Sequence, residues 1–311
     1  MVPASIRTPL DRRPLAREVA VAAAIVGAFV CWIQLLWPVA GLFTSSLGPA
    51  SLAESGVGSL AATALSNAAV VVAGTVAFAA GYARLRDRSL PLSLPARDAL
   101  PVVGAVALAP VAAIAAVELL AGATGTSLAA LTGTSYADGA GPLVPAVLTI
   151  VVLFMTLPAY VLVTHALVQR TIRSAASPGV AVGVTTLLVG TVDPTGLISS
   201  GSPLQVAAAT LFAVGGIALP AYAADAVDRA WLTAFCAVPL AIFVGGVLFQ
   251  SVTAVDGVAE GALELAKVGL VGAGAYAYER TDSLVPPALA YAAFVVARDA
   301  VSYLVATGAL A

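Results

Sequence analysis

Long apolar stretches follow one another along almost the whole chain, and each is about as long as a membrane-spanning helix. Such a helix needs about 20 apolar residues, and backbone inside the bilayer must satisfy its own hydrogen bonds, as an α-helix does. The chain offers about nine of these stretches: 19–43, 57–82, 99–121, 143–168, 179–198, 204–224, 231–252, 258–278 and 284–304. We therefore expect an all-α, polytopic transmembrane helix bundle with about nine spans.

The scarcity of charge supports the same class. Of the 311 residues, 60% are hydrophobic and only 10% are charged, whereas roughly a quarter of a soluble domain is charged. A water-soluble fold of this composition would lack the polar side chains to cover its surface. We expect the lipid bilayer as the main partner, a membrane protein or lipidated peptide as a further candidate, and no nucleic acid.

The arginines indicate which loops face the cytoplasm, because cytoplasmic loops carry an excess of basic residues. With nine spans, one side of the membrane holds most of the 14 basic residues: Arg7, Arg12, Arg13, Arg17, Arg84, Arg86, Arg88, Arg97, Arg170, Arg173, Arg229 and Arg280. Omitting the fifth stretch, which Asp193 and Pro194 interrupt, would move two of these arginines across. We expect a cell-membrane protein with a cytoplasmic N-terminal tail, residues 1–18, and its C-terminus outside.

Ionisable residues at membrane depth are functional candidates by default. They are Glu118, His165, Asp225, Glu264, Lys267, Arg298 and Asp299. His165 is the only histidine and supplies at most one metal ligand, so we expect it to be satisfied by neighbours or to lie at the interface. Glu264 and Lys267 are three residues apart and are expected to pair. Arg298 should find an acidic partner in the bundle or reach the outer interface.

The last third of the chain contains a distinctive run, VGAGAYAYERTDSLVPPALAY, at residues 271–291. It resembles the penultimate loop of the CPBP family, the CAAX-protease and bacteriocin-processing intramembrane metalloproteases. In that family a small-residue helix ends in a Tyr-Glu-Arg-Thr-Gly-Ser-Leu-like turn. Here Asp282 stands where glycine is usual. The resemblance implies a CPBP-like four-helix core at residues 203–311, preceded by a five-helix region at residues 19–199.

The family's three motifs can be placed on this sequence, but their catalytic residues are missing. Glu-Glu-x-x-x-Arg falls on Ala224, Asp225 and Arg229, Phe-x-x-x-His on Phe249 and Thr253, and His-x-x-x-Asn on Tyr291 and Val295. The family's reaction implies a glutamate as general base and histidines that hold or orient the charged centre. Only Asp225 and Arg229 keep their residue type, so these positions supply no confident catalytic residue and no metal ligand.

A second register places the first motif earlier in the chain. There the Glu-Glu pair falls on Tyr160 and Val161, the arginine on His165, and the first histidine position on Asp193. This register also lacks the catalytic residues, and it leaves about a hundred residues before Tyr291. The later register is therefore preferred.

The resemblance without the catalytic set predicts a non-catalytic binding or regulatory pseudoprotease that needs no cofactor. Two alternatives stay open. One is an active CPBP-type intramembrane endopeptidase that uses zinc with non-standard residues, namely Asp225, Thr253 and Tyr291. The other is a small-solute transporter with charged residues at the bilayer midplane, namely Arg298, Glu264 and Lys267.

Overall fold

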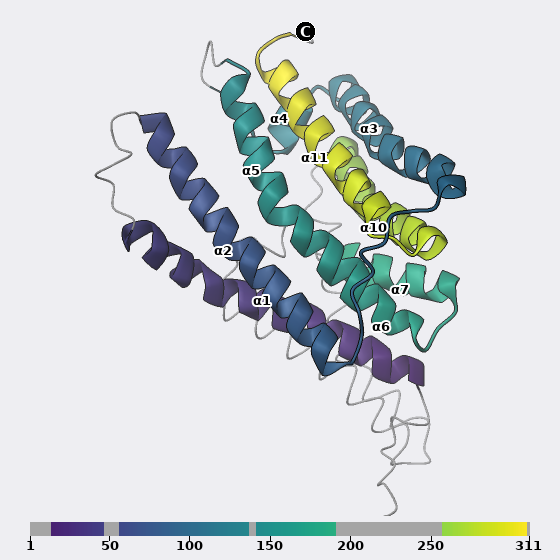
Figure 1. The fold of residues 1–311 in the computed structure, drawn as a ribbon. Helices are drawn as coiled ribbons and strands as arrows, with labels where there is room; N and C mark the ends of the chain where they lie inside the picture. Colours follow the sequence, from purple (N-terminus) through teal and green to yellow (C-terminus); the bar gives the residue numbers. More distant parts are fainter. Residues whose placement is uncertain (1–13, 47–55, 137–140, 191–256, 310–311) are drawn as a thin grey trace, which may run out of the picture.

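The computed structural model describes residues 14–46, 56–136, 141–190 and 257–309 (Figure 1). These residues form helices joined by turns and short links, and the described ranges contain no β-strand. The predicted all-α class is therefore confirmed. The predicted stretches 204–224 and 231–252 lie outside the described residues.

Five described helical segments are long and apolar enough to cross a membrane. They are Arg17–Leu42, Thr63–Leu85, Arg97–Ala123, Leu143–Arg173 and Val285–Ala306. They correspond to the first four and the last of the predicted stretches. The described chain thus has the helices of a multi-pass membrane protein, while the total of nine spans stays a prediction.

The helices follow in chain order with short links. Their bounds are α1 Pro14–Ser46, α2 Gly56–Leu85, η2 Arg97–Ala99, α3 Leu100–Ala123, α4 Leu128–Leu131, α5 Leu143–Ala159, η3 Tyr160–Gln169, α6 Arg170–Arg173, α7 Pro178–Gly190, α10 Val258–Thr281 and α11 Val285–Ala306. α5, η3 and α6 form one continuous rod, and its middle part, η3, is a π-helix of 10 residues. π-Helical segments are rare and often occur at functional sites.

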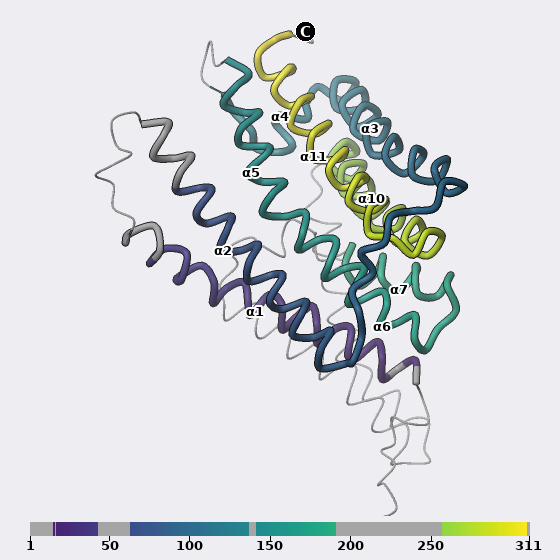
Figure 2. The backbone as a smooth tube through the Cα atoms, viewed as in Figure 1, coloured from purple at the N-terminus to yellow at the C-terminus, as the bar shows by residue number. Residues whose placement is uncertain are grey.

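The rod formed by α5, η3 and α6 lies between two groups of helices. α1 and α2 pack on one another and on the rod, whereas α10 and α11 pack on α3 and also contact η3. α7 packs against α10. This arrangement brings parts of α10 and α11 into contact with η3, and both helices lie beside the rod in Figure 2.

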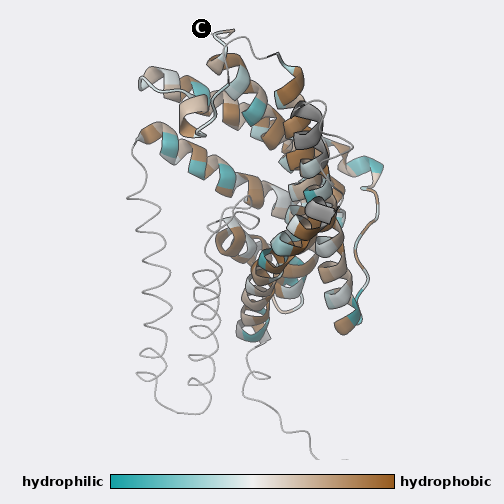
Figure 3. Ribbon diagram, turned by 90° about the vertical axis from the view of Figure 1, so that its left-hand side faces the viewer, coloured by the Kyte–Doolittle hydropathy of each residue, from teal (hydrophilic) through white to brown (hydrophobic). Residues whose placement is uncertain are grey.

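The outward faces of the helices are as apolar as a bilayer requires. Leucines such as Leu42, Leu119 and Leu143 are largely exposed along them, and Figure 3 shows hydrophobic residues along the length of the helices. A helix that is hydrophobic all round belongs in a large core or in a membrane. The exposed leucines therefore support the assignment to the bilayer.

The described arginines, except Arg298, gather at one end of the bundle, where α1 and α3 begin and α2, α6 and α10 end. They are Arg17, Arg84, Arg86, Arg88, Arg97, Arg170, Arg173 and Arg280. Contacts between helices hold this arginine-rich end together. Arg86 pairs with Glu18 at 3.1 Å, and the hydroxyls of Tyr82 and Thr171 lie 3.1 Å apart.

Candidate functional site

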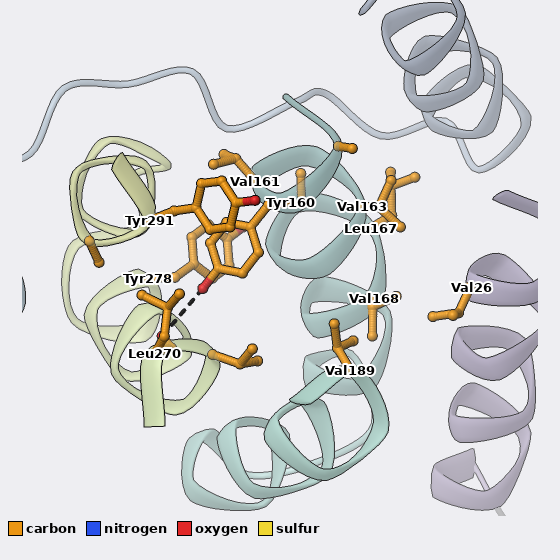
Figure 4. Packing of buried hydrophobic residues seen from close by; sticks show 14 of the residues in the cluster. Val26, Tyr160, Val161, Val163, Leu167, Val168, Val189, Leu270, Tyr278 and Tyr291 are labelled. Carbon is orange, nitrogen blue, oxygen red and sulfur yellow. Dashed lines mark hydrogen bonds between the residues drawn. The ribbon is translucent and has the colours of Figure 1, made fainter. Parts of the chain in front are cut away.

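Four aromatic side chains from three helices meet in the core where η3 faces α10 and α11. The rings of Tyr160 and Tyr291 stack with their centroids 4.5 Å apart. His165 meets Tyr160 edge-on at 5.2 Å, and its ring lies 6.1 Å from that of Tyr278. All four are buried. Figure 4 shows the three tyrosines of this aromatic cluster, with the Tyr160 hydroxyl donating a hydrogen bond to Leu270 O at 3.3 Å.

A glycine lets α10 approach the aromatic cluster closely. A Cβ atom at Gly274 would lie 2.9 Å from the Tyr160 hydroxyl and 3.0 Å from Nε2 of His165. A Cβ contact of 2.9 Å is essentially never seen, and one of 3.0 Å is tighter than nine in ten, so only glycine fits here without a shift. The small residues that precede the Tyr-Glu-Arg-Thr turn thus serve close helix packing.

A chain of hydrogen bonds fixes the orientation of His165. The amide Nε2 of Gln169 donates to Ala275 O at 2.8 Å and to Glu279 Oε1 at 3.1 Å. Arg173 donates to the other carboxylate oxygen of Glu279 at 3.0 Å. Since both amide hydrogens of Gln169 are donated to these oxygens, the atom that faces Nδ1 of His165 at 2.8 Å is the amide oxygen Oε1, which accepts a hydrogen bond from Nδ1. We call the side chains of His165, Gln169, Glu279 and Arg173 the polar chain.

The polar chain selects one tautomer of the imidazole. Since Nδ1 of His165 must carry the proton that Gln169 accepts, Nε2 of the neutral ring keeps a lone pair. Nε2 is buried and makes no hydrogen bond with the described residues. His165 was expected either to be satisfied by neighbours or to lie at the interface. Its Nδ1 has a hydrogen-bond partner in Gln169, and the residue is buried and does not lie at an interface. Metal-ligating histidines commonly donate their other ring N–H to a carboxylate or a backbone carbonyl, whereas His165 donates to the amide oxygen of Gln169, which Glu279 holds in turn.

A cavity at the arginine-rich end adjoins the polar chain. It has a volume of about 270 Å³ and is lined by Arg170, Arg173, Tyr278, Glu279 and Asp282. Glu279 belongs both to this cavity and to the polar chain. The polar chain therefore connects a cavity at the end of the bundle with the buried imidazole of His165.

The turn after α10 is made by a residue in the left-handed conformation. Asp282 ends the helix in the left-handed conformation, with φ at 45°. Glycine adopts this conformation most readily, and aspartate is among the residues that tolerate it.

The predicted motif positions fall partly inside the described residues. Tyr291 and Val295 lie one turn apart on α11 and are both buried, and Tyr291 contacts Tyr160, the first Glu position of the second register. Outside the described residues lie the first two motifs of the preferred register, namely Ala224, Asp225, Arg229, Phe249 and Thr253, and also Asp193 of the second register. The described positions of the second register are Tyr160, Val161, His165, Tyr291 and Val295, and of these Tyr160 and Tyr291 meet in the core.

The charged residues of the transporter alternative are paired locally. Glu264 and Lys267 form the expected i,i+3 ion pair at 2.7 Å on α10. Arg298 contacts its neighbour Asp299 at 2.8 Å, and Thr149 donates a hydrogen bond to Asp299 at 2.8 Å. Arg298 therefore has an acidic partner within the bundle.

Sequence reasoning missed Gln169 and Glu279. The available signal was the i,i+4 spacing of His165 and Gln169, which places both on one helix face. In the described part of the chain, no group of three or more His, Cys, Asp or Glu side chains could hold a metal ion. Comparison of the whole chain with protein-family profiles, with curated proteins and with solved structures gives no match.

Proposed function

We propose that this chain is a multi-pass membrane protein with a CPBP-like frame and a non-catalytic centre, a pseudoprotease that binds or regulates. The observation that carries the proposal is the stacking of Tyr160 on Tyr291 at 4.5 Å. These residues occupy a Glu position and a His position of the frame. In the second register, the contact between these two rings supports a frame whose first and last motif helices meet, with tyrosines in place of the reacting groups.

The side chains at these positions do not fit a zinc ion. Val161 and Val295 have no donor atoms, and the rings of Tyr160 and Tyr291 are packed against one another in the core. Zinc sites use thiolate, imidazole and carboxylate ligands. We therefore assign no hydrolytic step to this centre.

The cavity at the arginine-rich end is the best candidate for binding. Its lining includes both arginines and carboxylates, so it offers donors and acceptors to a polar group of a membrane protein or of a lipidated peptide. By the positive-inside tendency, this end faces the cytoplasm and the C-terminus faces outside.

Restoring the missing ligands tests the frame. We expect the set Tyr160→Glu, Val161→Glu, Asp193→His, Tyr291→His and Val295→Asn to gain about one zinc ion per chain, because it rebuilds the family's donors in the second register. The matched control rebuilds the other register with Ala224→Glu, Asp225→Glu, Thr253→His, Tyr291→His and Val295→Asn. Zinc content is measured on monodisperse protein after size-exclusion chromatography in detergent.

The unaltered protein supplies a second test that does not depend on the folding of the variants. We expect neither stoichiometric zinc nor cleavage of fluorogenic lipidated peptides in vesicles. Cleavage that Asp225→Ala abolishes and Arg298→Ala does not would overturn the pseudoprotease proposal. Zinc gained equally by both restored sets would contradict the assignment of the frame to Tyr160.

A further inference from the structure

A linker crosses the arginine-rich end of the bundle between α2 and η2. Residues 86–96, which we call the strap, run across the end where α6 and α10 finish (Figure 2). Arg170 donates a hydrogen bond to Ser89 O. Ser93 donates to Asp282 O at 3.0 Å, and Ser283 donates to Ser93 O at 2.6 Å. Contacts in its first half and in its middle therefore fix the course of the strap.

The strap carries leucines whose side chains stay exposed on the surface of the bundle. Leu92 is 73% exposed and Leu94 is 81% exposed, and Leu85, just before the strap, is 86% exposed. A single exposed leucine needs no explanation. These three highly exposed leucines, on and beside one fastened segment, therefore form an apolar edge at the arginine-rich end of the bundle.

Arginines flank this apolar edge. Arg86 is neutralised by Glu18, but Arg84, Arg88 and Arg97 form no ion pair within the described part of the chain. Apolar side chains combined with basic ones are typical of segments that lie in the interface of a bilayer. Basic residues at that depth attract anionic lipid headgroups.

We propose that the strap is an interfacial segment that binds anionic phospholipids in the leaflet at the arginine-rich end. Leu85, Leu92 and Leu94 lie among the upper acyl chains, and the three unpaired arginines contact headgroup phosphates. Charge complementarity selects the occupant, because a zwitterionic headgroup would place no net negative charge beside these arginines. This inference requires that the bundle spans a membrane and does not depend on the pseudoprotease proposal.

Lipid titration tests the charge component. Delipidated full-length protein in neutral detergent is titrated with phosphatidylglycerol and, separately, with phosphatidylcholine, and bound lipid is counted by native mass spectrometry. We expect tighter binding of phosphatidylglycerol and a loss of affinity of about fivefold for each of Arg84→Gln, Arg88→Gln and Arg97→Gln. Arg280→Gln is the matched control, since Arg280 lies at the same end but stacks on Tyr276, off the strap.

Fluorescence tests the position of the leucines. In a background with Cys31→Ala and Cys236→Ala, an environment-sensitive dye is attached through Leu92→Cys, or through Asp98→Cys as an exposed polar control. In nanodiscs, lipids spin-labelled near the glycerol group should quench the dye at 92 strongly and at 98 weakly. Equal quenching at both positions, or unchanged lipid affinity in the variant that combines Arg84→Gln, Arg88→Gln and Arg97→Gln, would overturn the proposal. A dye at 92 shielded from both water and lipid would instead indicate a protein partner.

Discussion

Gly274→Ala is expected to destabilise the protein by about 1–3 kcal/mol, as added atoms in a packed core typically do. The new Cβ would lie 2.9 Å from the Tyr160 hydroxyl and 3.0 Å from Nε2 of His165. Neither neighbour can move cheaply. The ring of Tyr160 is stacked on Tyr291, and Gln169 holds His165 through Nδ1.

Gly269→Ala is the matched control on the same helix. A Cβ at Gly269 has no described atom within 4 Å, and alanine favours a helix by up to about 1 kcal/mol over glycine. Thermal unfolding of both variants in the same detergent should therefore give a lower midpoint for Gly274→Ala and an unchanged or higher one for Gly269→Ala. Equal midpoints would show that the close approach of α10 to His165 is not important for stability.

The helices themselves were largely predictable, because a bilayer demands apolar stretches of nearly constant length. The expected stretches 57–82, 258–278 and 284–304 correspond to helices Gly56–Leu85, Val258–Thr281 and Val285–Ala306. The differences are a few residues at helix ends, where polar residues continue a helix beyond the apolar core. Glu279 and Arg280 extend α10 in this way.

The meeting of Tyr160 and Tyr291 was not predictable from motif spacing. Spacing in the sequence favoured the later register, whose first two motifs lie outside the described residues, so that preference stays a prediction. Small residues decide which helices become neighbours in space, and Gly274 is the clearest case, since its lack of a Cβ lets α10 pack against η3. Such a contact depends on the shapes of both helices, which hydropathy does not encode.

The environment of His165 shows a second limit. Its place near the end of an apolar stretch suggested either local satisfaction or an interfacial position, but the residue is buried. The partner that orients it, Gln169, is held in turn by Glu279, which lies 110 residues further along the chain. A carboxylate that belongs to a turn motif in the sequence thus becomes a hydrogen-bond partner of a buried side chain in the fold.

Gln169→Leu is expected to cost about 2–4 kcal/mol of stability. The change leaves buried Nδ1 of His165 without its acceptor and removes one hydrogen bond each from Ala275 O and from Glu279. Each buried polar group left without a partner costs about 1–3 kcal/mol. Thr164→Val is the matched control on η3, because the Thr164 hydroxyl is buried and has no hydrogen-bond partner in the described structure. An isosteric apolar replacement there should be neutral or stabilising.

The single histidine allows the same variant to test the tautomer directly. Nitrogen NMR of protein labelled with ¹⁵N-histidine in nanodiscs reports one imidazole, since the chain has 1 histidine. In the unaltered protein and in Thr164→Val, we expect a protonated Nδ1 and an unprotonated Nε2, because the amide hydrogens of Gln169 are both donated elsewhere. In Gln169→Leu this constraint is gone, and both tautomers should be populated. If Nε2 carries the proton in the unaltered protein, Nδ1 must accept a hydrogen bond, and the amide group of Gln169 must be flipped. Gln169 would then no longer donate to Glu279. That result would contradict the proposal that Glu279 orients the buried imidazole.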